Sequence, residues 1–112
     1  MEIEVYLEPI NERSIGFDFQ SEPDSRLGHA IDVYRLEKGF PDYTQANIAI
    51  IGVPEDRSCQ GNAGSASAPN EIRTPLYHLF SGFQNPKIVD LGNIKPGNEI
   101  NDTYFALTEV IN

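Results

Sequence analysis

Ile48-Ala-Ile-Ile-Gly-Val53 is the stretch that decides the fold. It is a continuous apolar run without alternation, which is typical of a parallel β-strand that helices cover on both faces. A second short apolar run, Lys87-Ile-Val-Asp-Leu91, follows later in the chain. The two runs predict neighbouring strands of one sheet.

A helix is expected between these two runs. Pro69 suits its first turn, and apolar residues then recur at the spacing of one helix face, at Ile72, Leu76, Leu79 and Phe80. Pro75 lies inside this pattern and predicts a kink or a split into two short pieces. Strand, helix and strand together predict a right-handed βαβ unit with parallel strands.

The flanks of this unit predict further elements. Met1–Leu7 alternates, with Ile3, Val5 and Leu7 on one side, and predicts a half-buried strand. Ser25–Leu36 has apolar residues at helical spacing and predicts a helix. Gly92–Asn98 is expected to be a loop. A last helix is expected after a cap at Asn101 or Asp102, carrying Tyr104, Leu107 and Ile111. The fold class is therefore α/β, with a small, mainly parallel sheet and a βαβ core.

Length and charge limit the function. The 112 residues are expected to form a single domain, and 39% hydrophobic residues allow only a lean core. Seventeen acidic against eight basic residues give a net charge of −9, which disfavours nucleic acid and anionic membranes as partners. The start of the chain is unlike a signal peptide, and Cys59 is the single cysteine. We expect a cytoplasmic protein.

The loop Glu55–Ala68 follows the first strand and precedes a helix, which is where open α/β sheets bind ligands. Its glycines, Gly61 and Gly64, are expected at positive φ. They do not form a nucleotide-binding pattern with Gly52, and no Gly-Lys-Ser/Thr follows. The sequence therefore favours a loop that lines a substrate site over a nucleotide site, and a loop that is only flexible stays open as the alternative. Cys59 is interpreted as an ordinary loop residue.

Other chemistry-bearing residues form no complete catalytic or metal-binding set. His29 and Asp32 are three residues apart, but a metal needs further ligands. His78 adjoins the apolar face of its helix and is interpreted as structural. Asp90 closes a predicted strand, where α/β folds place catalytic carboxylates, but it has no partner histidine. We predict neither catalytic residues nor metal ligands in this chain.

Several stretches, in this order, resemble the N-terminal part of the arginase/agmatinase/formimidoylglutamase (ureohydrolase) superfamily. The likeness is greatest to a formimidoylglutamase-like branch typical of Bacteroidetes-type bacteria. The stretches are Ile48-Ala-Ile-Ile-Gly-Val-Pro-Glu-Asp-Arg57, Gly61-Asn-Ala-Gly64, Ala68-Pro-Asn-Glu-Ile-Arg73, Ile88-Val-Asp-Leu-Gly-Asn-Ile-Lys-Pro-Gly97 and Asp102-Thr-Tyr-Phe-Ala106.

This resemblance implies a partial three-layer α/β/α, arginase-like fold. It also implies a parent hydrolase that cleaves a small amidine or guanidino substrate with two Mn²⁺ ions, which activate the attacking hydroxide. The metal-ligand motifs of the family, Gly-Gly-Asp-His, Asp-x-His-x-Asp and Asp-x-Asp, do not occur in this sequence. The resemblance thus predicts that residues 1–112 are an N-terminal fragment, inactive alone. It places Arg57, Gly61, Asn62 and Gly64 at the substrate-side rim, and the alternative that these residues only shape the loop stays open.

A different interpretation stays open at this point. The chain is then a free-standing small α/β domain that binds other proteins or itself. The edge of Ile48–Val53 is the expected contact, since an unpaired strand edge pairs readily with another chain. Under both interpretations a homo-oligomer is expected.

Overall fold

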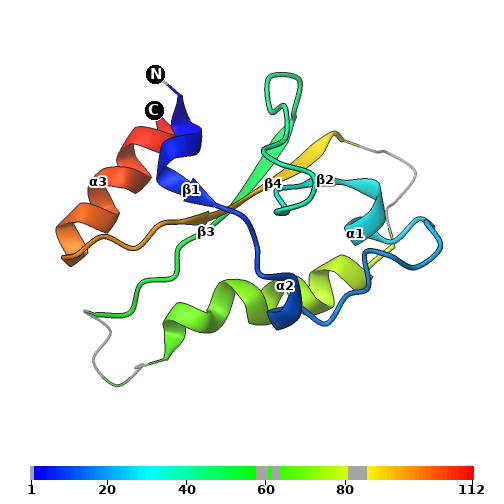
Figure 1. Ribbon diagram of the computed structural model, residues 1–112, viewed down its shortest axis with the longest axis horizontal. Helices are drawn as coiled ribbons and strands as arrows, with labels where there is room; N and C mark the ends of the chain where they lie inside the picture. The colour runs from blue at the N-terminus through cyan, green and yellow to red at the C-terminus, as the bar shows by residue number, and fades with distance from the viewer. Residues whose placement is uncertain (1, 58–60, 62–63, 81–85) are drawn as a thin grey trace.

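The computed structural model describes residues 2–57, 61, 64–80 and 86–112 (Figure 1). The strands are β1 (Leu7–Glu8), β2 (Asp32–Val33), β3 (Ile48–Gly52) and β4 (Ile88–Ile94). The α-helices are α1 (Leu27–Ala30), α2 (Ala68–His78) and α3 (Ile100–Ile111). Short 3₁₀ turns form at Ile3–Tyr6, Glu12–Ser14 and Ser65–Ser67.

Strand β4 is the centre of the sheet. Strands β2 and β3 both run parallel to β4 and both pair with Val89 and Asp90, so they lie on opposite sides of it. Strand β1 pairs antiparallel with the end of β4, through Leu7–Ile94 and Glu8–Asn93. The α/β class and the parallel β3–α2–β4 unit are confirmed. This small mixed sheet is consistent with an arginase-like fold.

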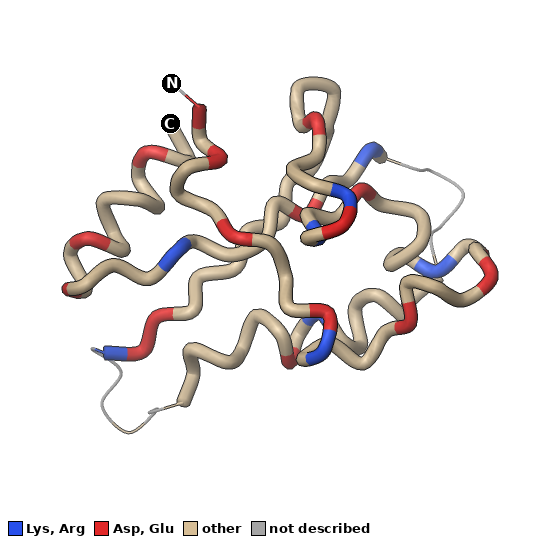
Figure 2. The backbone as a smooth tube through the Cα atoms, in the orientation of Figure 1, with Lys and Arg blue, Asp and Glu red and all other residues tan. Residues whose placement is uncertain are grey.

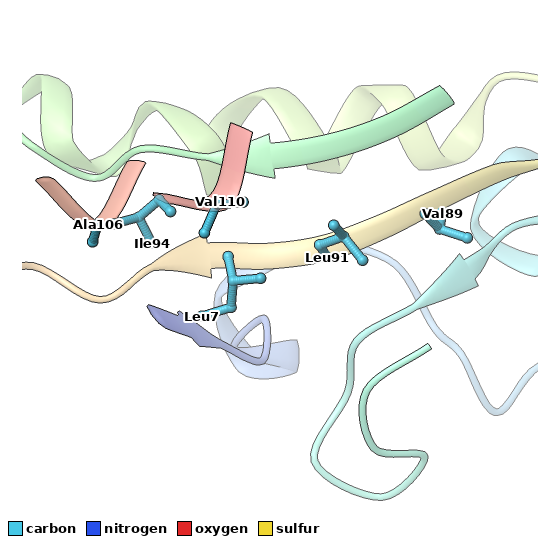
Figure 3. Packing of buried hydrophobic residues seen from close by; sticks show 6 residues of the cluster. All are labelled: Leu7, Val89, Leu91, Ile94, Ala106 and Val110. Carbon is cyan, nitrogen blue, oxygen red and sulfur yellow. The ribbon is translucent and has the colours of Figure 1, made fainter. Parts of the chain in front are cut away.

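The side chains of β4 alternate between two helical layers. Val89 and Leu91 belong to a buried cluster that includes Ala106 and Val110 of α3 (Figure 3). The intervening Asp90 points to the other face, where it bonds to Arg73 of α2. Helices α2 and α3 therefore cover opposite faces of the sheet (Figure 1).

A second buried cluster lies between α2, β2 and the segment that follows β1. It packs the segment after β1 against α2 and β2, and its members are Ile10, Ile15, Phe17, Ile31, Val33 and Tyr77. The Phe17 and Tyr77 rings meet edge to face with centroids 5.8 Å apart. A Cβ on Gly28 would lie 2.4 Å from the Phe17 ring, so this glycine allows α1 to approach the aromatic ring closely.

Two predicted elements near the N-terminus are wrong. Residues 3–6 form a 3₁₀ turn with Val5 61% exposed, and only Leu7–Glu8 is a strand. Within Ser25–Leu36 only Leu27–Ala30 is helical, and Asp32–Val33 joins β4. Period and propensity are weak signals in short segments, and strand pairing with β4 overrides them here.

The burial of β3 also differs from the prediction. Its last residue, Gly52, is buried, but Ile48 and Ala49 are exposed. Strand β4 in turn is longer than predicted and continues to Ile94, into the segment expected to be a loop. The start of β3 is therefore not covered by helices on both faces, although its apolar sequence predicts this coverage.

Helix α2 is one continuous helix that contains Pro75, so the proline does not split it. Of its four predicted apolar positions, only Leu76 packs against a buried cluster, and the other three are exposed. Ile72 is 60% exposed, Leu79 and Phe80 follow the helix, and the fully buried residues are Arg73 and Tyr77. The Arg73–Asp90 ion pair and the buried Tyr77 therefore join α2 to the sheet.

The N-cap of α3 lies two residues before Asn101 and three before Asp102, the two predicted caps. Glu99 is its N-cap, and a carboxylate oxygen of Asp102 accepts the Glu99 N–H at 3.2 Å, which completes a capping box. The buried residues of α3 are Thr103, Ala106 and Val110. The predicted apolar positions Tyr104 and Ile111 are exposed.

Candidate functional site at the carboxyl edge of β3 and β4

Because β3 and β4 are parallel, their carboxyl ends meet at one edge of the sheet. The segment after Gly52 leads from β3 toward α2, and the segment after Ile94 leads from β4 to α3. This edge is the usual ligand site of α/β sheets. It is the place that the sequence predicted for a substrate-lining loop.

Arg57 joins the two segments at this edge. Its Nε donates to a Glu55 carboxylate oxygen at 2.8 Å, and one terminal nitrogen donates to the Asn98 carbonyl at 2.9 Å. The other terminal nitrogen bonds to Glu55 and donates to the Thr103 hydroxyl at 3.0 Å. Thr103 is fully buried at the start of α3 and accepts the Gly97 N–H at 2.9 Å. All three guanidinium nitrogens therefore bind protein acceptors.

The charge of Glu55 is stabilised by this arrangement. The side chain and the backbone N–H of Arg57 both donate to its carboxylate, and they lower the pKa of Glu55 to about 2. The side-chain hydrogen bond to Glu55 in turn raises the pKa of Arg57. The pair therefore stays ionised across the physiological pH range.

This lowered pKa predicts a pH dependence of folding stability. A carboxylate with a depressed folded-state pKa contributes stability above its ordinary pKa, and that contribution is lost on acidification. For Glu55 the window runs from its ordinary value of 4.5 down to about 2. We expect Glu55→Gln to lower the urea midpoint at pH 7 and to lose that effect at the acid end of this window.

The control for this prediction is Glu37→Gln, since Glu37 is an exposed glutamate in a turn away from this edge. Its urea midpoint should follow that of the unmodified chain at every pH. A Glu55→Gln difference that stays constant between neutral pH and the acid end would contradict the assignment.

The loop that follows is shaped by Asp56 and two glycines. One Asp56 carboxylate oxygen accepts the N–H groups of Gly64 at 2.7 Å and Ala66 at 3.3 Å. Gly61 and Gly64 have φ of 79° and 99°, which confirms their predicted positive φ. Asp56 thus binds the free N–H groups that precede α2. The predicted site residue Asn62, and Cys59, lie outside the described residues.

Behind the edge lies a buried ion pair. Arg73, 2% exposed, donates from Nε and a terminal nitrogen to the two Asp90 carboxylate oxygens at 2.8 and 2.9 Å. It also donates to the Gly92 carbonyl at 2.9 Å and to the Asn93 side-chain oxygen at 2.6 Å. Asp90 further accepts the Tyr77 hydroxyl at 2.5 Å and the Gly92 N–H at 3.0 Å. Both carboxylate oxygens are therefore saturated.

This ion pair corrects the interpretation of Asp90. Asp90 lies within β4 rather than at its end, and it is fully buried. Its partner is the structural residue Arg73. Burial opposes the charge of Arg73, but its bonds to Asp90 outweigh that effect and raise the pKa of Arg73. Burial, and then the Asp90 charge, raise the pKa of Tyr77. The sequence analysis assigned no role to Arg73, although a charged residue on each of two buried elements was a usable signal.

The two histidines lie away from this edge. His29 bonds to Asp24 at 3.0 Å, and His78, at the far end of α2, bonds to the Gly16 carbonyl at 2.6 Å. Both rings pack against Phe17, with centroids 4.8 and 5.2 Å from it. Asp32 is exposed in β2. Within residues 2–57, 61, 64–80 and 86–112, no three His, Cys, Asp or Glu side chains gather to hold a metal ion. The described residues do not fit a dinuclear metal centre.

Known proteins resemble this chain over part of its length. The chain is 31% identical over 83 residues to the formimidoylglutamases of Salmonella paratyphi C and Salmonella choleraesuis, and 30% identical to that of Salmonella typhi. The match covers 70% of this chain and 26% of each relative. This similarity supports a relationship to the ureohydrolase family.

The chain spans about a quarter of the length of these curated relatives. No family model and no solved structure matches it. In the part of the chain that the structure describes, no helix is long and apolar enough to cross a membrane.

Proposed function

We propose that this chain forms the N-terminal part of a formimidoylglutamase-like ureohydrolase, which hydrolyses a C–N bond of a small linear amidine or guanidino substrate. The observation that carries the proposal is the 31% identity to formimidoylglutamases over 83 residues. The ordered motifs of β3, the following loop, α2 and β4 support it. We also propose that the complete enzyme belongs to the formimidoylglutamase-like branch typical of Bacteroidetes-type bacteria and that it is cytoplasmic.

In this proposal the chain supplies scaffold and rim rather than the reacting groups. The Arg73–Asp90 pair fixes α2 to β4, and Arg57 holds the rim segment that follows β3. Arg57, Gly61, Asn62 and Gly64 form the substrate side of that rim. The two Mn²⁺ ions of the complete enzyme bind residues outside those described here. The 112-residue chain alone is inactive.

A chimera tests the proposal. The 83 matched residues of the Salmonella paratyphi C formimidoylglutamase are replaced by those of this chain, and hydrolysis of formimidoylglutamate is measured with Mn²⁺. We expect measurable turnover, because the substituted segment restores the same scaffold. Arg57→Ala in the chimera should lower kcat/KM by ~10-fold or more, since a rim that shifts by about 1 Å loses on the order of 100-fold in rate.

The control in the same chimera is Lys38→Ala, an exposed cation in the turn after β2. Its kcat/KM should equal that of the parent chimera. A chimera with the far-ultraviolet circular dichroism of the Salmonella enzyme and no hydrolysis would overturn the proposal. If Arg57→Ala and Lys38→Ala changed kcat/KM equally, Arg57 would have no role in positioning the substrate-side rim.

A further inference from the structure

Arg35, which follows β2, is a largely buried cation with few partners. Its side chain is 12% exposed, and one terminal nitrogen donates to a Glu12 carboxylate oxygen at 3.3 Å. Among the described residues, no protein acceptor binds its Nε or its other terminal nitrogen. Arg57 and Arg73, by contrast, use all three guanidinium nitrogens. Arginine side chains are seldom buried without partners, so Arg35 has donors for a further acceptor.

A cavity of about 150 Å³ adjoins Arg35. Phe19, Ile31 and Val33 form its apolar wall. The residues that line it all belong to residues 19–38, so its walls come from one segment and do not depend on the outer edges of the sheet. Figure 1 shows α1 and β2 at one end of the molecule and the segment that follows β3 at the other. The cavity is therefore separate from the candidate site at the carboxyl edge of β3 and β4.

The guanidinium of Arg35 is held in place by its surroundings. Its central carbon lies 4.6 Å from the centroid of the Phe19 ring, which is within the range of a cation–π contact. The Phe19 ring itself packs edge to face against Phe17 and Tyr77, with centroids 5.1 and 5.7 Å away. The Gly39 N–H donates to the Arg35 carbonyl at 2.8 Å and fixes the backbone in a turn. A ligand therefore binds a cation that needs little further ordering.

His29 forms part of the cavity wall rather than a second ligand-binding group. Its side chain is 6% exposed, and Nδ1 bonds to an Asp24 carboxylate oxygen at 3.0 Å. Its Nε2 bonds to the Ser21 hydroxyl at 3.2 Å. Both ring nitrogens therefore have protein partners, and Arg35 is the group that recognises a ligand.

Charge and geometry limit the kind of ligand. The net charge is −9, and acidic residues are spread over α3, the N-terminal segment and the connecting loops (Figure 2). This field repels a dianion such as phosphate more strongly than a monoanion. Glu12 takes one terminal nitrogen of Arg35, which leaves Nε and the other terminal nitrogen. These two groups form a planar fork that matches the two oxygens of a carboxylate.

The size of the cavity and its apolar wall limit the rest of the ligand. At ~30 Å³ per water molecule, the cavity has room for about five waters. A carboxylate with a short hydrocarbon chain, such as butyrate, fills this space. Each methylene group that is buried against the wall should raise the affinity by roughly 4-fold.

We propose that this cavity binds a short-chain monocarboxylate through Arg35. Nε and one terminal nitrogen of Arg35 donate to the two carboxylate oxygens, and the hydrocarbon chain lies against Phe19, Ile31 and Val33. This proposal is independent of the proposed hydrolase function, because none of these residues belongs to the rim at the carboxyl edge of β3 and β4.

A nuclear magnetic resonance titration of the ¹⁵N-labelled 112-residue chain with sodium butyrate, at constant ionic strength, tests this site. We expect saturable shifts of the Phe19 and Val33 amide signals, with a Kd of ~1 mM. Acetate lacks two of the methylene groups and should bind roughly 10-fold more weakly. Inorganic phosphate should also bind more weakly than butyrate, because the acidic chain repels a dianion more strongly.

Three variants separate recognition by Arg35 from a structural effect. Arg35→Met keeps an unbranched side chain beside Phe19 but removes the donors, and should weaken butyrate binding by about 10-fold or more. Arg13→Met is the matched control, since Arg13 is an exposed arginine beside Glu12, and should leave the Kd unchanged. Glu12→Gln removes the carboxylate that competes for Arg35 and should tighten binding several-fold, a gain that misfolding does not produce.

The opposite results would overturn the proposal. One is the absence of saturable shifts up to ~100 mM butyrate, far above the expected Kd. Another is an unchanged Kd in Arg35→Met, or a weaker affinity in Glu12→Gln. Phosphate that binds as tightly as butyrate would also contradict the assigned ligand class.

Discussion

Replacing Arg73 with alanine is expected to lower the free energy of unfolding by about 3–5 kcal/mol, the range for breaking a buried ion pair from one side. Arg73 donates to both Asp90 carboxylate oxygens, to Asn93 and to the Gly92 carbonyl. Its removal leaves the fully buried Asp90, among the described residues, with the Tyr77 hydroxyl and the Gly92 N–H as its remaining donors. Urea unfolding, followed by circular dichroism, measures the loss.

The control on the same helix is Glu71→Ala. Glu71 is exposed, so its replacement should change the free energy of unfolding by no more than about 0.5 kcal/mol. A double variant, Arg73→Met with Asp90→Leu, should lose less than the sum of the two single variants, because neither charge is then left unpaired. A cost below about 1 kcal/mol for Arg73→Ala would show that water compensates the Asp90 charge.

The βαβ unit was predictable because several signals in this part of the sequence agree. Ile48–Val53 is apolar without alternation, Pro69 fits a first helical turn, and both features match the tertiary structure that forms. The position of the candidate site followed from the same reasoning, since parallel strands fix which edge receives the loops. The positive φ of Gly61 and Gly64 was likewise a local property.

The elements that were predicted wrongly depend on distant partners. Asp32–Val33 is a strand because β4 lies beside it, and the sequence around it has a helical period. Glu55 and Thr103 hold Arg57, yet Thr103 is 46 residues away along the chain. Ile72 is exposed because Arg73 and Tyr77, rather than the apolar positions of α2, face the sheet. Spacing within one segment does not reveal such contacts.

Gly92 is the second position where a small change should have a large effect. It has φ of 82°, within β4, at the point where β1 joins the sheet. A Cβ there would lie 2.1 Å from the Glu8 carbonyl oxygen and 3.2 Å from the Tyr34 ring. Backbone atoms move only with their strand, so Gly92→Ala must displace β1 or unwind the end of β4.

We expect Gly92→Ala to cost about 2–5 kcal/mol, as the sum of ~1–2 kcal/mol for the left-handed backbone and ~1–3 kcal/mol for overpacking. Gly39→Ala is the matched control, because Gly39 has φ of 80° and would meet no atom within 4 Å. Its cost should be only the backbone part, ~1–2 kcal/mol. The difference between the two urea unfolding free energies then isolates the contact with Glu8. Equal costs at the two glycines would mean that β1 does not press on β4 at Gly92. The antiparallel pairing that anchors the N-terminal segment would then contribute little to the fold.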